Sequence, residues 1–283
     1  MRVLVTGAMG QLGRALKAEL GESGADWVDL PELDIADAVA VDAWFAAHGP
    51  YEVVYNCAAY TNVDGCETDF AAAFRANALG PMNLARACAA CGATLVHVST
   101  DYVFPGTEAG ERVETDVPAP ISAYGRSKLA GEGLALAANR RTHVVRTAWL
   151  YGEGKNFVRT MLAVAERHAQ VTVVDDQLGN PTSATDLARQ LVRIAASEEF
   201  GVWHCTNEGT CSWADLAQAA FELAGVDCVV RRCSSADWKR MHPEAAARPA
   251  FSSLANAKLE ATIGNGMRPW REALAEYLTP HAG

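Results

Sequence analysis

The sequence predicts an α/β fold whose centre is a doubly wound parallel sheet covered by helices on both faces. Short apolar runs alternate with helical patterns along the first half of the chain, which indicates successive βαβ units. A glycine-rich loop, 7–13, lies between the first apolar run and the first helical pattern, as it does in folds of the Rossmann type. The rest of the chain is expected to add a smaller α/β part that is interleaved with the sheet.

The elements of the first half follow from these patterns in chain order. The expected strands are Val3–Thr6, Trp27–Leu30, Val53–Asn56, Thr94–Ser99 and Thr142–Thr147. The expected helices are Gln11–Leu20, Ala38–His48, Phe70–Ala76, Met82–Cys91 and Ala123–Ala138. We expect a break at Gly80-Pro81, because proline lacks the N–H that a helix interior uses.

After Trp149 the alternation loosens, and the second half reads as a mixture of shorter elements. The expected helices are Phe157–Arg167, Thr185–Ala196, Trp213–Ala224 and Trp270–Leu278, and the expected strands are Val171–Val174, Val202–Cys205 and Val229–Arg231. Residues 175–183 read as a polar loop, and an extended stretch begins at Arg248-Pro249. We expect a Rossmann domain over residues 1–150, with later segments returning to it. Residues 151–283 are expected to form a mainly substrate-binding part.

Composition excludes several classes of function. The chain has 283 residues, 50% of them hydrophobic, and a formal net charge of −10, which argues against a nucleic-acid partner. No apolar stretch approaches a membrane span, and the first apolar run is too short for a signal peptide, so we expect a cytoplasmic protein. Cys88 and Cys91 form a CxxC without a second pair at metal-ligand spacing, so the eight cysteines are expected to be free thiols and no metal site is predicted.

The glycine loop predicts a bound dinucleotide. Gly7 permits the tight turn, Gly10 lets the backbone approach a pyrophosphate, and Gly13 lets the helix pack close to the strand. Asp29 lies about 20 residues beyond the loop, where an acid binds the adenosine ribose and disfavours a 2′-phosphate. No arginine lies close to Asp29 in the sequence, which favours NADH over NADPH without excluding NADPH. The expected cofactor is therefore NADH or NADPH.

Tyr124, Lys128 and Thr100 form the predicted reaction centre. Tyr124 and Lys128 are four residues apart on an expected helix, so they share a face. Thr100 follows an expected strand, and the carboxyl ends of parallel strands line the cofactor cleft. A carbonyl oxygen that receives hydride needs a proton, and a nearby ammonium is expected to lower the pKa of the tyrosine toward neutral pH. Thr100 would hydrogen-bond the same oxygen.

These residues resemble the extended short-chain dehydrogenase/reductase family, and within it the dTDP-4-dehydrorhamnose reductase branch. The matching segments are Gly7–Gly13, 56–64 with Cys66-Glu67, 99–104, 124–132, 146–152, Asn156-Phe157, Asp176-Gln177, Gly179, Pro181-Thr182 and Arg248-Pro249, then Ser252, Leu254, Lys258-Leu259 and Trp270. The segment 100–104 and the Arg248-Pro249 tail are what indicate the branch. The resemblance implies reduction of the 4-keto group of dTDP-4-dehydro-β-L-rhamnose to dTDP-β-L-rhamnose, a precursor for cell-surface polysaccharide.

The resemblance also implies roles for individual residues. Tyr124 is the proton donor, Lys128 holds the nicotinamide ribose and tunes the tyrosine, and Thr100 binds the reacting oxygen. The implied cofactor contacts are Gly10, Gln11 and Leu12 at the pyrophosphate, Asp29, Asp34 and Ile35 at the adenosine, and Ala59, Tyr60 and Thr61 after the third strand. The implied sugar contacts are Thr100, Asp101 and Trp149.

One departure concerns metal and assembly. Some reductases of this type form dimers through a divalent metal held by carboxylates, one of them early in the first helix. Here that turn reads Arg14-Ala15-Leu16-Lys17, with no acid before Glu19. A metal-bridged dimer is therefore not expected, and the chain is predicted to be a monomer or a homodimer.

Two other functions remain open. A nucleotide-sugar epimerase or dehydratase would share the fold, but a dehydratase needs an acid pair after the threonine and Asp101 is followed by Tyr102. A non-catalytic nucleotide-binding subunit like the regulatory one of methionine adenosyltransferase also shares the architecture, although an intact Thr100, Tyr124 and Lys128 favours catalysis. A tightly retained cofactor would indicate the first, and co-purification with a partner enzyme the second.

The other polar and aromatic residues receive structural interpretations. His97 is expected to be a core histidine, and Trp203, Trp213, Trp238 and Trp270 are expected to be packing residues of the smaller part. The candidates for the diphosphate are Asn156, Arg159 and Arg248, because an anion needs donors and a guanidinium.

Overall fold

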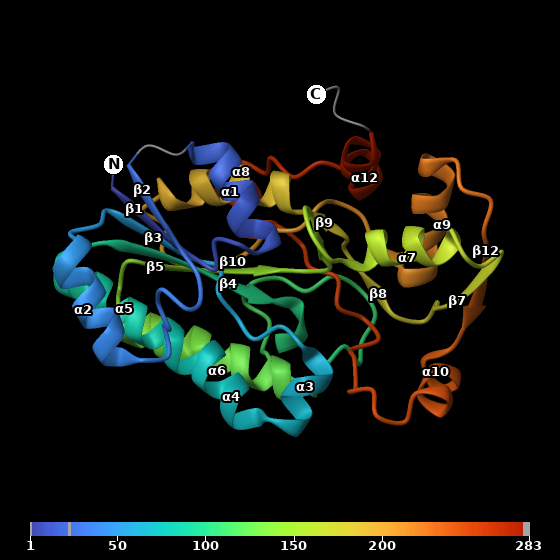
Figure 1. Ribbon diagram of the computed structural model, residues 1–283, viewed down its shortest axis with the longest axis horizontal. Helices are drawn as coiled ribbons and strands as arrows, with labels where there is room; N and C mark the ends of the chain where they lie inside the picture. The colour runs from blue at the N-terminus through green and yellow to red at the C-terminus, as the bar shows by residue number, and fades with distance from the viewer. Residues whose placement is uncertain (1, 22–23, 280–283) are drawn as a thin grey trace.

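The structure, a computed structural model, describes residues 2–21 and 24–279. Its centre is a six-stranded sheet in the order β10-β5-β4-β3-β1-β2, and every neighbouring pair is parallel (Figure 1). The strands are β1 (Val3–Thr6), β2 (Ala25–Val28), β3 (Val53–Asn56), β4 (Thr94–Thr100), β5 (Thr142–Thr147) and β10 (Gly201–His204). The predicted doubly wound parallel sheet is confirmed.

Helices cover both faces of this sheet (Figure 1). One face carries α2 (Ala38–His48), α5 (Gly80–Cys91) and α6 (Ala123–Ala138), and the other carries α1 (Gln11–Leu20), α8 (Ala184–Ala195) and the short α11 (Ala257–Ala261). Alternate strand residues supply the two cores, as the pleat requires. Val5 and Tyr55 pack beneath α1 and α8, while Leu4 and Val54 pack beneath α2 and α5.

Smaller elements pack beside the carboxyl edge of the sheet. The helices there are α7 (Phe157–Ala165), α9 (Trp213–Ala224), α10 (Ser235–Met241) and α12 (Trp270–Leu278). The strands are β6 (Leu150–Tyr151) paired with β9 (Thr182–Ser183), β8 (Leu178–Gly179) with β11 (Cys211–Ser212), and β7 (Gln170–Val174) with β12 (Val229–Cys233). Strand β10 belongs to the large sheet, and helix α8 packs on one of its faces. The later half of the chain is therefore interleaved with the earlier half. The ends of the two predicted parts, at residue 1 and residues 280–283, lie outside the described residues.

Several expected boundaries differ from the structure. The second strand ends at Val28 rather than Leu30, because the Asp29 carboxylate accepts the backbone N–H of Leu30 at 2.9 Å and begins a turn. The expected polar loop, 175–183, contains β8 and β9. Two short helices, α3 (Val63–Thr68) and α4 (Phe70–Phe74), precede α5, and only the second was expected.

The predicted break at Gly80-Pro81 is wrong. The chain passes from α4 through a π-helical turn, Arg75–Leu79, directly into α5. Pro81 then lies in the first turn of α5, where a missing N–H interrupts no intrahelical hydrogen bond. Such π turns often occur at functional sites, and this one faces the cavity described below.

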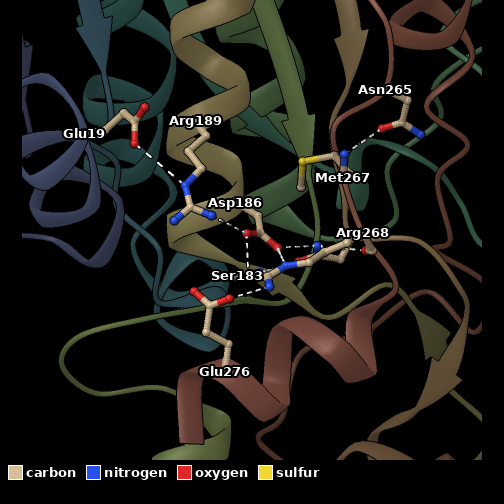
Figure 2. Close-up of polar contacts among 9 residues, drawn as sticks. Glu19, Ser183, Asp186, Arg189, Asn265, Met267, Arg268 and Glu276 are labelled. Carbon is tan, nitrogen blue, oxygen red and sulfur yellow. Dashed lines mark hydrogen bonds and ion pairs between the residues drawn. The ribbon is translucent and has the colours of Figure 1, made fainter. Parts of the chain in front are cut away.

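A buried carboxylate joins α8 to the C-terminal segment (Figure 2). Arg268 donates to both oxygens of Asp186, from Nε at 2.8 Å and from Nη2 at 2.9 Å. Asn207 donates to the same carboxylate at 2.8 Å, and Arg268 also pairs with Glu276 of α12. The side chain of Asp186 is 4% exposed, so these donors take the place of the water that would otherwise solvate its carboxylate.

We expect Asp186→Asn to lower the free energy of unfolding by about 3 kcal/mol, because it leaves the Arg268 guanidinium without its buried counter-ion. Urea denaturation of the purified protein measures the change. Asp42→Asn is the control, since its pair with Arg86 is more than half exposed on both sides and is expected to contribute less than about 1 kcal/mol. Equal losses in the two variants would show that the buried Asp186 network stabilises the fold no more than an exposed ion pair does.

Candidate functional site

A cavity of about 740 Å³ lies at the carboxyl ends of the parallel strands. Thr6, Cys57, Thr100 and Thr147, at or just beyond the ends of β1, β3, β4 and β5, line it. This is the edge where ligands bind in open α/β sheets. The predicted site residues that line it are Gly7, Gly10, Gln11, Leu12, Gly13, Asp29, Asp34, Ile35, Ala59, Tyr60, Thr61, Thr100, Asp101, Tyr124, Lys128 and Trp149.

The glycine loop has the shape that a pyrophosphate needs. Gly7 has φ +69°, and a Cβ there would lie 2.6 Å from the backbone nitrogen of Ala58, so a side chain is excluded. A Cβ at Gly13 would lie 2.4 Å from the carbonyl oxygen of Gly7. Gly10 precedes α1 and offers no side-chain cap, so the first N–H groups of the helix face the cavity without one. A helix start of this kind binds phosphate.

Asp29 is tied to the glycine loop. One of its carboxylate oxygens accepts the N–H of Met9 at 3.0 Å, and the other accepts the N–H of Leu30. The carboxylate therefore fixes the loop against the end of β2, and Asp29 lines the cavity. Arg14, which follows the loop on α1, lines the same cavity and pairs with Glu153. A guanidinium is thus present near the loop although no arginine adjoins Asp29 in the sequence.

An asparagine of the π turn fixes the segment after β3. Asn77 accepts the N–H of Tyr60 at 2.7 Å and donates to the carbonyl oxygen of Tyr60 and to the Ser127 hydroxyl, both at 3.0 Å. It thereby joins the segment containing Ala59, Tyr60 and Thr61 to α6. Asn77 was not predicted as a site residue, because its role depends on the π turn that the predicted helix break had excluded.

Tyr124 lies in the first turn of α6, which the Ser122 hydroxyl caps by accepting the N–H of Gly125 at 3.1 Å. A Cβ at Gly125 would lie 2.2 Å from the carbonyl oxygen of Tyr102, so glycine is what lets the helix approach the turn after β4. This close approach places the Tyr124 phenol near the Thr100 hydroxyl, and both side chains line the cavity. The predicted proton donor and the predicted oxygen-binding residue are therefore neighbours.

The pKa of Tyr124 shifts in the direction opposite to the one expected. Burial raises the pKa of the phenol, the Asp101 carboxylate raises it further, and the Thr100 hydroxyl partly opposes the rise. The Nζ of Lys128 donates to the carbonyl oxygen of Val98 at 2.7 Å, and burial with the Asp101 carboxylate decides the direction of the Tyr124 pKa shift. Tyr124 consequently keeps its proton at neutral pH, which is the state that a proton donor requires.

Lys128 is a buried cation held by further charges. Burial lowers its pKa to about 8, and the nearby Glu132 carboxylate opposes that fall. Glu132 is itself paired with Arg146, whose Nη2 lies 2.7 Å and whose Nε lies 3.0 Å from its oxygens, and it accepts the Ser99 hydroxyl at 2.6 Å. Both members of the pair are less than 5% exposed. Lys128, Glu132 and Arg146 thus form a row of alternating charges that extends from the cavity wall into the core.

Asp101 is buried directly beside Thr100. Its Oδ1 accepts the Thr100 hydroxyl at 2.9 Å, while its Oδ2 has no hydrogen-bond partner among the residues that the structure describes. Burial raises the pKa of this carboxyl to about 7, against hydrogen bonds that lower it. An unpaired, buried oxygen on the cavity wall is suited to a ligand hydroxyl.

Two tryptophans meet on the cavity wall. Trp149 and Trp213 both line it, and their rings stack with centroids 3.6 Å apart and planes inclined by 9°. The sequence analysis assigned Trp213 to packing alone, and this is incomplete. It lies far from Trp149 in the chain, so only the fold brings the two rings together.

The sequence model of the RmlD substrate binding domain family matches residues 1–282. The chain belongs to this family. The resemblance inferred from the motifs is thereby confirmed at the level of the family.

Family members that have been named or solved resemble this chain over nearly its whole length. The dTDP-4-dehydrorhamnose reductase of Mycobacterium tuberculosis is 45% identical over 291 aligned residues, which cover 99% of this chain and 93% of that protein. The crystal structure of a dTDP-4-dehydrorhamnose reductase from Clostridium acetobutylicum has a TM-score of 0.93 at 44% identity, with 98% of each chain covered. The Bacillus anthracis enzyme of the same name, solved in complex with NADP, has a TM-score of 0.92 at 36% identity, with 98% of each chain covered.

The three residues predicted to bind the diphosphate, Asn156, Arg159 and Arg248, lie outside the residues that line this cavity. Asn156 caps α7, where its side chain accepts the N–H of Arg159 at 3.0 Å and donates to the Tyr277 hydroxyl at 3.0 Å. The Nε of Arg159 donates to the same hydroxyl at 2.7 Å. Arg248 pairs with Asp64 at 3.2 Å. Their contacts with a diphosphate stay predictions.

The remaining interpretations concern core residues. His97 is fully buried and its Nδ1 lies 3.1 Å from Asn56 Nδ2, as expected of a core histidine. All eight cysteines are free, and Cys91 is exposed. Within residues 2–21 and 24–279, no cluster of histidine, cysteine or acidic side chains has the arrangement of a metal site. In the same part of the chain, no helix is both long and apolar enough for a bilayer crossing.

Proposed function

We propose that this chain reduces the 4-keto group of dTDP-4-dehydro-β-L-rhamnose to the hydroxyl of dTDP-β-L-rhamnose, with NADH or NADPH as the hydride donor. One observation carries the proposal. In a member of this family, the glycine loop and the triad of Thr100, Tyr124 and Lys128 line one cavity, so a dinucleotide and a keto sugar fit side by side. The names of the relatives supply the identity of the sugar.

The chain's own residues perform the proton half of the reaction. A bound NADH or NADPH supplies the hydride to C4 of the sugar, and the C4 oxygen then needs one proton. Thr100 orients that oxygen through its hydroxyl, and Tyr124 transfers its phenolic proton to it. In this proposal the ammonium of Lys128, which remains charged below about pH 8, holds the nicotinamide ribose of the cofactor. The net change is one hydride and one proton added across the carbonyl.

The choice between NADH and NADPH depends on two side chains of opposite charge, Asp29 and Arg14. The Asp29 carboxylate disfavours a 2′-phosphate, whereas Arg14 on the same cavity wall could pair with one if it left Glu153. A Bacillus anthracis relative was solved with NADP. We therefore propose that both cofactors are accepted, that the protein acts in the cytoplasm as a monomer or homodimer, and that its product serves cell-surface polysaccharide.

A coupled measurement tests this function. Purified protein is mixed with dTDP-4-dehydrorhamnose and either NADH or NADPH, loss of the reduced cofactor is followed by absorbance, and the product is identified by NMR. We expect stoichiometric oxidation of the cofactor with formation of dTDP-rhamnose, and slower turnover of other 4-keto nucleotide sugars. Conversion of the sugar without net loss of cofactor would instead identify an epimerase. No consumption of either cofactor would overturn the proposal.

A further inference from the structure

The backbone of Trp149 has an unusual conformation. Its φ is +43°, and among residues 2–21 and 24–279 it is the one non-glycine residue with a positive φ. A bulky side chain in this region is strained, and such conformations persist where surrounding contacts hold them. Trp149 stands between β5 and β6 on the cavity wall, close to the strand end that carries Thr147. Its indole must therefore be held by its neighbours.

Two neighbours hold the indole of Trp149. Trp213 stacks on it at 3.6 Å, and a Cβ at Gly179 would lie 2.5 Å from its Cε2 atom, so no side chain fits there. Both contacts come from the antiparallel pair of strands β8 and β11 or from the residue that directly follows it. Gly179 of β8 pairs with Cys211 of β11, and β11 runs directly into Trp213 at the start of α9. The position of the ring thus depends on the fold of the C-terminal half.

Further contacts at the start of α9 hold Trp213 in place. Ser212 and Asp215 form a capping box at the start of α9, with hydrogen bonds of 3.0 and 3.1 Å. The Ser212 hydroxyl also donates to Asp175 at 2.7 Å. Arg232 lies between the two carboxylates and pairs with Asp215 at 2.8 Å. The ring of Phe157 packs against the indole of Trp213, with the ring centroids 4.6 Å apart. Trp213 is therefore a rigid support.

We propose that Trp213 is a positioning residue that holds the indole of Trp149 as a flat wall for the apolar face of the keto-sugar ring. The inference rests on the proposed function and adds the residue that orients the sugar. The faces of an indole carry partial negative charge, which attracts the C–H groups of a pyranose and the methyl group of a deoxy sugar. A wall at a fixed position keeps the carbonyl at Thr100 and Tyr124, where small displacements cost rate.

The cofactor end of the cavity does not depend on this wall. The glycine loop belongs to β1 and α1, and the segment after β3 is held by Asn77, so neither is supported by Trp213. Loss of Trp213 should weaken sugar binding and leave dinucleotide binding unchanged. This separation distinguishes a positioning role from general destabilisation.

The test compares Trp213→Ala, Trp213→Phe and the control Trp270→Ala. Trp270 packs in the same C-terminal core but does not line the cavity. For Trp213→Ala we expect the KM for the nucleotide sugar, and the Kd for dTDP-rhamnose by calorimetry, to rise about tenfold, the size expected for one lost aromatic pair. The KM for the reduced cofactor should stay within about twofold. Trp213→Phe should restore most of the affinity, since a phenyl ring can stack.

An unchanged sugar KM and Kd in Trp213→Ala would overturn the inference. A parent that binds the nucleotide sugar without reducing it would refute the proposed function alone.

Discussion

Replacement of Tyr124 by phenylalanine should lower kcat for the 4-keto sugar about 10³-fold, because the C4 oxygen then has no positioned proton donor. Phenylalanine keeps the ring that packs edge-on against Tyr102 at 5.9 Å, so the cavity should keep its shape. The KM for the reduced cofactor should change little, since the glycine loop is untouched. Steady-state kinetics with each substrate varied in turn measure these effects.

Tyr55→Phe is the matched control for this substitution. The Tyr55 hydroxyl is buried in the sheet without a hydrogen-bond partner and does not line the cavity, so its loss should leave kcat unchanged. A Tyr124→Phe variant that retained most of the parent rate would show that another group supplies the proton. Asp101 would then be the first candidate, because burial raises the pKa of its carboxyl to about 7.

Glu132→Gln should produce the largest loss of stability, about 3–5 kcal/mol in the free energy of unfolding. The substitution preserves shape but leaves the buried Arg146 guanidinium without its counter-ion and removes the carboxylate that supports the charge of Lys128. Denaturant unfolding of the purified variant measures the loss.

A double variant separates charge from packing in this prediction. Combining Glu132→Gln with Arg146→Met removes the unpaired cation and should recover much of the lost stability, because apolar replacements of buried ion pairs are often tolerated. Its activity should also decline at a lower pH than that of the parent. Without the Glu132 carboxylate the pKa of Lys128 falls further, so its charge is lost earlier as pH rises. A double variant no more stable than Glu132→Gln would contradict this account.

Local patterns were sufficient to predict most of the fold. Apolar strands between helical patterns predicted the parallel sheet, and the loop 7–13 predicted where a dinucleotide binds, since both depend on residues close together in the chain. The helical spacing of Tyr124 and Lys128 predicted, for the same reason, that the two side chains share one face of a helix, and both line the cavity. The predicted break at Gly80-Pro81 failed because a π turn shifts the hydrogen-bond pattern and makes the proline harmless.

The sequence by itself determined the sheet, the glycine loop and the triad, because each depends on periodicity or on short spacing along the chain. Only the tertiary structure decided the environment of that triad. Burial and the Asp101 carboxylate raise the pKa of Tyr124, where the sequence predicted that Lys128 would lower it. Tertiary structure also brought Trp213 onto Trp149, since long-range packing between the two halves of the chain leaves no trace in local spacing.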